Sequence, residues 1–538
     1  MTPSAHLDTF TIDRLPAPAD MPELLFDLPS LQFPPRLNCA SELLDRWVER
    51  GQGGRLCIQG HDRRWTYAEL QAHANRIARV LVDELGLVPG NRVLLRGANS
   101  PWLAACWFGV VKAGGVAVGS MPMLRARELR GLIAKAEISH ALCDARLADE
   151  LAAAAADSPA LKHMLHFNGG GAAGSLEARA ASKPAAFTNV DTAATDPVLI
   201  AFTSGTTGVP KGTVHFHRDL MAACACWPQH VLRATADDVF IGSPPLAFTF
   251  GLGGLLLFPL AVGASTVLIE KASPDALLAA TARFRASVCF TAPTAYRAMA
   301  ALAPGHDLAS LRKCVSAGEA LPGPTRALWK EVTGIELIDG IGSTELLHIF
   351  ISAPEHLARA GATGLPVPGY RACVLGDDGQ ELPAGEVGRL AVKGPTGCKY
   401  LADERQRQYV QNGWNLTGDA YRIGADGQFE YQARTDDMIV SGGYNIAGPE
   451  VEEALLLHPA VAECGVIGRA DEARGQVVTA FVVLKAGVAG DAAMAQGLQD
   501  FVKQTIAPYK YPRQVVFRDS LPRTETGKLQ RFRLRSEP

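Results

Sequence analysis

Residues 203–212, with the sequence TSGTTGVPKG, follow an apolar run at 198–202 whose sequence is VLIAF. The run predicts a buried strand, and the segment after it combines hydroxyls and small residues with a single lysine, Lys211. Successive backbone N–H groups in such a loop point outward and form a concavity that attracts anions. The hydroxyls add hydrogen-bond donors, and Lys211 adds a positive charge. The stretch therefore predicts a polyphosphate-binding loop at the end of a strand.

This loop differs from the common P-loop, which has the pattern G-x-x-x-x-G-K-[ST]. Pro210 stands five residues after Gly205, and Lys211 is followed by Gly212 instead of serine or threonine. The alternative is a flexible surface turn, but the preceding strand and the terminal Pro-Lys-Gly argue against it. We therefore expect a phosphate loop of a different class.

Length, composition and charge limit the function classes. The chain has 538 residues, more than one hydrophobic core usually supports, so at least two domains are expected. A formal net charge of −3 argues against a broad nucleic-acid-binding surface, and no nucleic-acid partner is expected. The 11 cysteines include no pairs at zinc-ligand spacing, so they are expected to be reduced thiols of a cytoplasmic protein.

Neither a secretory signal nor a membrane partner is expected. The first 20 residues include acidic side chains and lack the apolar core of a signal peptide. The uncharged stretch 239–269 is interrupted by Pro244, Pro245 and Pro259 and by several glycines. Such breaks favour buried strand, loop and helix pieces over a membrane-spanning helix.

Amphipathic helices and apolar strands alternate along the chain as far as about residue 360. Thr66-Tyr-Ala-Glu69 is a capping box, and apolar residues at helical spacing follow it up to Gly86, which is expected to end the helix. The clearest other pairs are a helix at 104–113 before a strand at 115–118, and a helix at 277–286 before a strand at 288–290. This alternation predicts an α/β fold with mixed or parallel sheets covered by helices.

The residue composition and the predicted secondary structure change twice in the last third of the chain. From about Gly361 the segments are short and rich in β-formers and turns, which predicts a small β-barrel-like subdomain. From residue 438 helices expected at 448–457 and 493–506 alternate with strands at 464–467 and 477–484, which predicts a small α+β domain. We therefore expect a large N-terminal domain at 1–432, a hinge at 433–437 and a mobile C-terminal domain at 438–538.

The quoted loop resembles the phosphate loop of the adenylate-forming superfamily, which comprises acyl- and aryl-CoA ligases, luciferases and peptide-synthetase adenylation domains. Other segments resemble further elements of that family in the same order. They are Ser316-Ala-Gly-Glu-Ala320, Gly342-Ser-Thr-Glu345, Thr417-Gly-Asp419, Ala433-Arg-Thr-Asp-Asp437 and Pro522-Arg-Thr-Glu-Thr-Gly-Lys528. Only Ala433 departs from the family pattern, which has glycine there. The resemblance extends over residues from about 50 to 530.

The resemblance implies a two-step reaction that uses ATP, Mg²⁺ and coenzyme A. A carboxylate attacks the α-phosphate of ATP to give an acyl-adenylate and diphosphate, and a thiol then displaces AMP. The first step brings two anions together, so the site must neutralise charge where it develops.

The resemblance also implies roles for individual residues. The residues implied for the β- and γ-phosphates are Thr203, Ser204, Gly205, Thr206, Thr207, Gly208 and Lys211. Those implied for adenine and ribose are Ala317, Gly318, Glu319, Ala320, Gly340, Ile341, Gly342, Asp419 and Arg434. Thr344 would bond the α-phosphate, and Glu345 would hold Mg²⁺. Lys528 would reach the α-phosphate and the carboxylate oxygen in the transition state.

Each of the charged residues also has a structural explanation. Glu345 could be an acidic residue at a helix N-terminus, Asp419 could be a turn residue, and Lys528 could be a solvated lysine near the C-terminus.

The second half-reaction is expected to need a second domain arrangement. Asp436 occupies the hinge position of the family. Rotation there would withdraw Lys528 and present Ser441, Gly442, Gly443 and Tyr444 to the pantetheine of CoA.

Two further segments favour an aromatic acid. Phe248, Thr249, Phe250 and Gly251 lie where the family lines its acyl pocket, and His348 resembles the histidine that lines the aryl site of benzoate-type CoA ligases. Ordinary core aromatics and a structural histidine are the alternatives. Segments 4–10 and 394–403 most resemble the 2-aminobenzoate branch.

Three other functions are weaker alternatives. A stand-alone adenylation enzyme that loads a carrier protein would share the motifs, and so would a non-catalytic nucleotide sensor. A dehydrogenase has only Gly169-x-Gly171-x-x-Gly174 in its favour, in an alanine-rich loop. The expected partners are small molecules, and the sequence leaves open whether the protein is a monomer or a homodimer.

Overall fold

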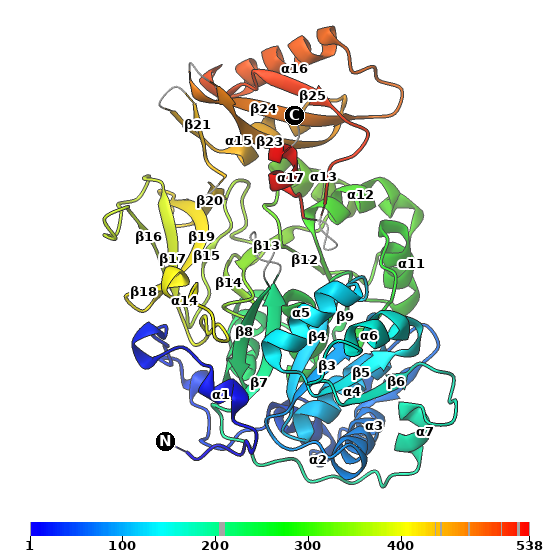
Figure 1. Ribbon diagram of the computed structural model, residues 1–538. Coiled ribbons are helices and arrows are strands. Elements are labelled where there is room, and N and C mark those ends of the chain that lie inside the picture. Colours follow the sequence, from blue (N-terminus) through cyan, green and yellow to red (C-terminus); the bar gives the residue numbers. More distant parts are fainter. Residues whose placement is uncertain are drawn as a thin grey trace.

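A computed structural model describes residues 2–203, 210–435, 437–441, 444–471, 474–506, 508–523 and 528–536. Figure 1 shows a large N-terminal body, a β subdomain coloured yellow at its side and a C-terminal domain in orange and red above both. The expected α/β class, with a separate small C-terminal domain, is confirmed.

A six-stranded sheet carries the loop quoted above. Its strands, in spatial order, are β6 (His163–Phe167), β5 (His140–Asp144), β3 (Arg92–Arg96), β4 (Val116–Ser120), β7 (Pro197–Thr203) and β8 (Lys211–Phe216). All neighbours are parallel except β7 and β8, which form an antiparallel hairpin. The apolar run before the loop is therefore a strand, as predicted, and the loop joins it to β8.

A nine-stranded mixed sheet forms the second large layer. Its strands, in order, are β15 (Leu365–Pro366), β14 (Ile349–Ser352), β13 (Leu337–Gly342), β12 (Lys313–Ala317), β11 (Val288–Thr291), β9 (Val239–Gly242), β10 (Ser265–Val267), β1 (Leu56–Gln59) and β2 (Arg64–Thr66). Strands β9 to β13 run parallel, and β14 returns antiparallel to β13. This return brings the segment after β13 back across the carboxyl ends of the parallel strands.

Helices cover both faces of each large sheet. The helices of the N-terminal part are α1 (Phe10–Asp13), α2 (Arg46–Glu49), α3 (Tyr67–Arg79), α4 (Pro101–Lys112), α5 (Ala126–Ala136), α6 (Ala148–Ala155), α7 (Leu176–Ala181), α8 (His217–Ala225), α9 (Thr249–Leu252), α10 (Phe258–Ala261), α11 (Pro274–Phe284), α12 (Pro293–Leu302) and α13 (Gly323–Thr333). One core joins α3, α4 and α8 to strands of both sheets, while α5 and α6 cover the outer face of one sheet and α11 to α13 that of the other. Every residue of α4 is buried, which explains why its sequence is apolar on all sides except at Lys112, which pairs with Asp45.

The two smaller units have a five-stranded sheet each. The subdomain contains β16 (Arg371–Leu375), β17 (Gly388–Lys393), β18 (Val410–Gln411), β19 (Trp414–Ile423), β20 (Phe429–Arg434) and the short α14 (Gln406–Tyr409). The C-terminal domain contains β21 (Ile439–Ser441), β22 (Tyr444–Ile446), β23 (Val461–Asp471), β24 (Gly475–Leu484), β25 (Gln514–Phe517), α15 (Gly448–Leu456), α16 (Ala492–Thr505) and α17 (Arg531–Ser536). The change from one sheet to the other falls between β20 and β21.

The local predictions agree with these elements except at helix ends. The Thr66 capping box is present, but α3 ends at Arg79 and continues as the π-helical turn Val80–Glu84 before Gly86, which adopts a positive φ of 64°. The remaining π-helical turns are Ser41–Asp45, Pro228–Leu232 and Gly253–Leu257, and the 3-10 turns are Pro18–Asp20, Pro29–Leu31, Ala145–Leu147, Ala303–Gly305 and Pro508–Lys510.

The uncharged stretch at 239–269 is divided among β9, α9, α10 and β10, as expected for buried pieces. Among the helices that the structure describes, none combines the length and the apolar character needed to cross a bilayer. All 11 cysteines lie in the described part and none of them forms a disulfide.

Candidate active site

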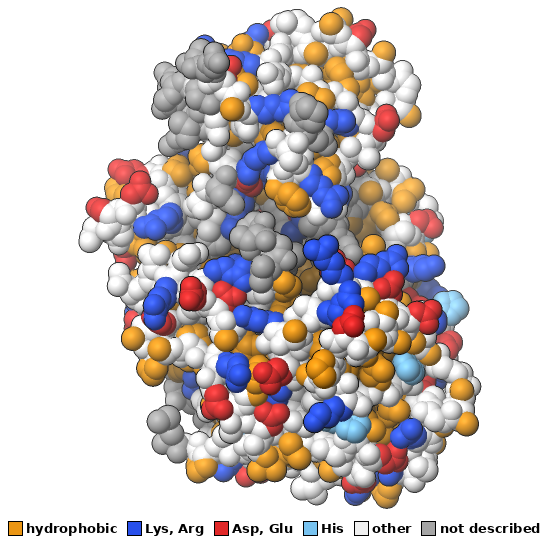
Figure 2. All heavy atoms as spheres, in the orientation of Figure 1, with side chains coloured by type: hydrophobic (Ala, Val, Ile, Leu, Met, Phe, Trp, Pro, Cys, Tyr) orange, Lys and Arg blue, Asp and Glu red, His pale blue; other side chains and the backbone are white. Residues whose placement is uncertain are grey.

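A cleft of about 1030 Å³ lies where the large domain, the β subdomain and the C-terminal domain meet. Figure 2 shows this face hollowed between the C-terminal domain and the rest, with Lys and Arg side chains bordering the hollow. The cleft is lined by Lys211, Glu345, Asp419, Arg434 and Lys528, which come from segments far apart in the sequence. The cleft therefore gathers the charged residues that the sequence singled out.

The two ends of the quoted loop lie in this cleft. Thr203 ends β7, Lys211 begins β8, and the two residues are paired in the antiparallel register. Lys211 Nζ donates a hydrogen bond to the Tyr400 hydroxyl at 3.2 Å and stands 5.1 Å from the centre of its ring. Ser204, Gly205, Thr206, Thr207 and Gly208 lie outside the described residues.

The segment after β13 places Glu345 at the cleft. Gly340 and Gly342 allow β14 to pass close by, because a Cβ at either position would lie 2.7 Å from an atom of Ile349 or His348. The Glu345 side chain is nearly buried, and its Oε1 accepts a hydrogen bond from the Tyr400 hydroxyl at 2.6 Å. A carboxylate beside a phosphate-loop lysine supplies the oxygen donors that Mg²⁺ prefers, so the residues present fit such an ion.

Backbone contacts support the same segment from behind. His215 Nε2 lies 2.8 Å from the Thr344 carbonyl oxygen, and burial lowers the pKa of His215 to about 4. A neutral imidazole that carries its proton on Nε2 donates to this carbonyl. Thr344 and Ile341 both line the cleft.

Asp419 and Arg434 form one corner of the cleft. They face each other across β19 and β20, and Arg434 Nη1 donates to Asp419 Oδ1 at 3.1 Å and to the Thr417 carbonyl at 2.9 Å. Gly418 has a positive φ of 77°, and a Cβ there would lie 2.6 Å from Arg434 Nη2. Burial raises the pKa of Asp419, whereas Arg434 opposes that rise. The corner therefore offers a buried carboxylate whose two oxygens can accept hydrogen bonds from two hydroxyl groups.

The segment after β12 supplies another wall. Gly318, with a positive φ of 95°, Glu319 and Ala320 line the cleft. Ala317 differs from the expectation: it is buried as the last residue of β12 and packs in the core instead of lining the cleft. Glu319 Oε1 accepts a hydrogen bond from Arg523 Nη1 of the C-terminal domain at 3.3 Å. Burial raises the pKa of Glu319, and the charges of Arg523 and Lys528 oppose the rise.

Lys528 is an exposed residue of the C-terminal domain that lines the cleft. Its Cε lies 3.8 Å from the point that a Cβ on Gly318 would occupy. Its charge also opposes the rise in the pKa of Asp419 that burial causes, as expected for an ammonium group within electrostatic reach of that corner. Lys528 therefore shares one cleft with both ends of the phosphate loop.

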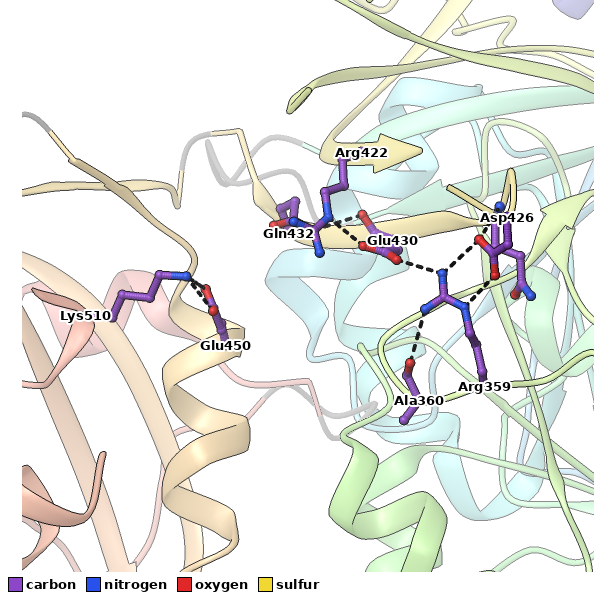
Figure 3. A network of polar contacts seen from close by, with 9 residues as sticks. Arg359, Ala360, Arg422, Asp426, Glu430, Gln432, Glu450 and Lys510 are labelled. Atoms are coloured by element: carbon purple, nitrogen blue, oxygen red, sulfur yellow. Dashed lines mark hydrogen bonds and ion pairs between the residues drawn. The ribbon is translucent and has the colours of Figure 1, made fainter. Parts of the chain in front are cut away.

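Figure 3 shows the polar network on the β-subdomain wall. Arg359 donates to Asp426 at 2.7 and 3.0 Å and to Glu430 at 2.7 Å. Arg422 Nε donates to the other oxygen of Glu430 at 2.5 Å. The carboxylates of this wall are thus paired with arginines, so the wall does not repel an anionic nucleotide.

The residues expected in the aryl pocket form two groups. His348 Nε2 lies 3.4 Å from the Phe250 carbonyl oxygen, and the two rings are 5.6 Å apart. Phe248 and Thr249 instead line a separate apolar cavity of about 20 Å³. None of these residues, nor Gly251, lines the cleft between the domains. The structure therefore brings His348 and Phe250 together, whereas Phe248 and Thr249 line the small cavity.

His348 is held in an apolar setting. It is 4% exposed, its ring lies 4.4 Å from that of Phe258, and burial lowers its pKa to about 3. A Cβ on Gly253 would lie 2.3 Å from His348 Cδ2, so glycine is required there. Leu347, with a positive φ of 73°, turns the chain between Glu345 at the cleft and His348 behind it.

The expected hinge and CoA-binding residues lie largely outside the described part of the chain. Asp436, Gly442 and Gly443 are among the residues that the structure does not describe. Ser441 is buried at the end of β21 and pairs with Tyr444 at the start of β22. Ser441 does not line the cleft in this arrangement of the domains.

Sequence reasoning missed three residues at this site. Asp339 lines the cleft one residue before Gly340, Arg523 reaches it from the C-terminal domain, and Tyr400 contacts Glu345. All three lie within or next to segments that were singled out by their sequence. Their positions depend on contacts between distant segments, which a single sequence does not display.

Asp339 leads to a pH-dependent prediction. Burial raises its pKa to about 7, so the folded protein holds a proton that the unfolded chain releases near pH 4. Between about pH 4 and 7 the wild-type protein should therefore lose stability relative to Asp339→Asn, by up to ~1.4 kcal/mol per pH unit. Thermal melting of both proteins from pH 4 to 8 measures this, with Asp237→Asn at a 98% exposed side chain as the control. Parallel curves for wild type and Asp339→Asn would contradict the raised pKa of Asp339.

Comparisons with known proteins agree with this geometry. Residues 44–400 match the family model described as AMP-binding enzyme, and residues 450–528 match that of the AMP-binding enzyme C-terminal domain. A benzoate–CoA ligase from Thauera aromatica is 35% identical over 514 residues, which cover 94% of this chain and 97% of the relative.

Two solved structures are similar over almost their whole length. An anthranilate CoA ligase, AuaEII, in complex with anthranoyl-AMP superposes with a TM-score of 0.90 at 34% identity, covering 95% of this chain and 98% of that one. A benzoate CoA ligase from Burkholderia xenovorans LB400 superposes with a TM-score of 0.85 at 32% identity, covering 93% of this chain and 100% of that one.

Proposed function

Since the chain belongs to the AMP-binding enzyme family, as an AMP-forming aryl-CoA ligase that uses ATP, Mg²⁺ and CoA, we propose that its acid is 2-aminobenzoate or benzoate. The observation that carries the choice of ring is the neutral, buried His348 against Phe250, directly after the segment that holds Glu345. An apolar site with one neutral polar group suits a flat, uncharged ring whose carboxylate points toward the nucleotide. The likeness to an anthranilate CoA ligase favours 2-aminobenzoate, and the likeness to benzoate–CoA ligases makes benzoate the second candidate.

The proposed roles follow the positions in the cleft. The carboxylate attacks the α-phosphate, the bond to diphosphate breaks, and the CoA thiol then loses its proton and displaces AMP. Lys211 and the loop before it hold the β- and γ-phosphates, Thr344 binds the α-phosphate, and Asp419 accepts the ribose hydroxyls. Glu345 would hold Mg²⁺, which supplies charge neutralisation when bound. Lys528 donates to the α-phosphate and the carboxylate as charge develops between them.

We further propose that the C-terminal domain, 438–538, rotates about 433–437 between the two half-reactions. The position of Lys528 in the cleft supports the first of the two arrangements. Rotation would exchange it for the segment from Ser441 to Tyr444, of which Ser441 does not line the cleft here. All 11 cysteines lie among the described residues and are free thiols, which supports a location in the cytoplasm.

Pyrophosphate release with a panel of acids tests the proposed substrate. The panel comprises 2-aminobenzoate, benzoate, hydroxybenzoates, phenylacetate and medium-chain fatty acids. We expect kcat/KM to be highest for 2-aminobenzoate or benzoate, and a preference for fatty acids would refute the proposal. CoA-dependent AMP release without any carrier protein separates the ligase from an enzyme that loads carriers. Absence of pyrophosphate release with every acid would point to a sensor.

His348→Ala should change the acid preference more than the affinity for ATP. The variant removes an aromatic neighbour of Phe250 and leaves a cavity in an apolar region, so larger ring substituents should be tolerated. We expect the kcat/KM ratio between benzoate and substituted benzoates to shift by at least about tenfold, as ~1.4 kcal/mol of lost contacts would produce. Measured KM values for ATP provide the control, and a larger effect on ATP than on the acid would place His348 outside the aryl pocket.

A further inference from the structure

Tyr400 connects two charged residues of the cleft that come from different parts of the chain. Its hydroxyl donates to Glu345 Oε1 at 2.6 Å and accepts a hydrogen bond from Lys211 Nζ at 3.2 Å. The side chain is 1% exposed, and Glu345 is 8% exposed. One buried hydroxyl therefore joins the proposed magnesium carboxylate to the lysine of the phosphate loop.

The backbone around Tyr400 extends the phosphate-loop hairpin. Val214 N donates to the Lys399 carbonyl and Leu401 N donates to the Gly212 carbonyl, both at 2.8 Å, so residues 399–401 lie antiparallel to β8. Thr213 pairs with Tyr400 in this register, and the Tyr400 N–H donates to Gln406 Oε1 at 2.9 Å. The hydroxyl is thus aimed at Glu345 by a fixed stretch of backbone rather than by a free loop.

The chemistry of the contact defines its direction. A carboxylate offers only acceptor oxygens, so the Tyr400 hydroxyl is the donor in the 2.6 Å hydrogen bond to Glu345. Lys211 has only donors, so it must use the hydroxyl oxygen as an acceptor. Lys211 therefore donates a hydrogen bond to Tyr400, and Tyr400 donates one to Glu345. These two hydrogen bonds stabilise the nearly buried negative charge of Glu345.

We propose that Tyr400 is a positioning residue for metal–ATP binding: its hydroxyl fixes the Glu345 carboxylate for Mg²⁺ and holds Lys211 beside it until the phosphates arrive. The inference rests on the proposed function. A hydrogen bond to a charged group in a buried site restricts its rotamers, and a fixed carboxylate loses less freedom when an ion binds. Arrival of the β- and γ-phosphates gives Lys211 a stronger partner, while Tyr400 retains its bond to Glu345.

Tyr400→Phe removes this hydroxyl and keeps the ring, which packs edge-on against Tyr409 at 5.8 Å between centroids. We expect the affinity for Mn²⁺ in the presence of ATP, measured by electron paramagnetic resonance without acid or CoA, to fall about tenfold, the equivalent of ~1.4 kcal/mol. Adenylation should slow at low Mg²⁺ and recover at high Mg²⁺. Thioester formation from supplied aryl-adenylate, which needs no ATP, should stay within about twofold of wild type, below ~0.4 kcal/mol.

Tyr67→Phe is the matched control, because its buried hydroxyl donates to the Ala264 carbonyl at 2.7 Å away from the cleft. This variant should bind Mn²⁺ and ATP as wild type does. Unchanged Mn²⁺ affinity in Tyr400→Phe, or equal losses in both half-reactions, would overturn the role of Tyr400. If the wild-type protein itself bound no Mn²⁺ with ATP and released no pyrophosphate with any acid, the proposed function would fail instead.

Discussion

Lys528→Ala is expected to slow aryl-adenylate formation by about 10²–10³-fold, because removing one donor aimed at developing charge costs roughly 2.7–4 kcal/mol. Lys528 lines the nucleotide cleft together with Lys211, Glu345 and Asp419. The attack of one anion on another leaves the reaction dependent on positive charge at this point. Pyrophosphate release with 2-aminobenzoate or benzoate and saturating ATP measures the loss.

The same variant should form aryl-CoA from supplied aryl-adenylate at a rate within about threefold of wild type, a difference of less than ~0.7 kcal/mol. The proposed rotation removes Lys528 from the cleft before CoA reacts, so the second half-reaction does not need its charge. Lys503→Ala is the control, because Lys503 lies on α16 and pairs with Asp500 at 2.8 Å. Equal losses of both half-reactions in Lys528→Ala would contradict the assigned role.

The sequence predicted the class of fold because its strongest signals are local. The apolar run at 198–202, the Thr66 capping box and the largely apolar residues of α4 are local sequence patterns, and each lies in the expected strand or helix. The end of α3 was less predictable. Its apolar spacing continues through the π-helical turn Val80–Glu84, so periodicity marks the whole segment and not the change of hydrogen bonding within it.

The site was predictable where a motif and a glycine coincide. The positive φ of Gly418 favours glycine, and the approach of β14 requires glycine at 342, so the T-G-D and G-S-T-E segments carry their geometry in their own sequence. The resemblance covers a whole segment, but successive side chains in a strand point to opposite faces, so Ala317 packs in the core while the next three residues line the cleft. Phe248 lines a small apolar cavity apart from His348.

Residues that act through distant contacts escaped prediction altogether. Tyr400 and Glu345 are separated by 55 positions, and Arg523 and Glu319 by 204. Nothing in the local pattern around Tyr400 distinguishes it from an ordinary core tyrosine. The burial of its neighbour Lys399 could not be predicted either. A lysine is usually exposed to solvent, yet this one is fully buried.

Lys399→Met is expected to lower the free energy of unfolding by about 3–5 kcal/mol, because it leaves a buried carboxylate without its charged partner. Lys399 Nζ lies 2.8 Å from Asp219 Oδ2, and the two side chains are 1% and 0% exposed. Asp219 also accepts a hydrogen bond from the Phe216 N–H at 3.0 Å, where β8 meets α8. Urea and thermal unfolding measure the loss.

Two further variants separate the ion pair from the packing of the lysine stem. Arg371→Met breaks a pair of the same length, 2.8 Å, whose side chains are both exposed, and should cost at most about 1 kcal/mol. Adding Asp219→Asn to Lys399→Met removes the stranded charge and keeps an acceptor for Phe216, so the double variant should be more stable than Lys399→Met alone. A cost in Lys399→Met no larger than that in Arg371→Met would mean that the buried charges are not coupled. Since residues 399–401 lie against β8, loss of this pair should also weaken the backbone that carries Tyr400, and Mn²⁺ affinity in the presence of ATP should fall with it.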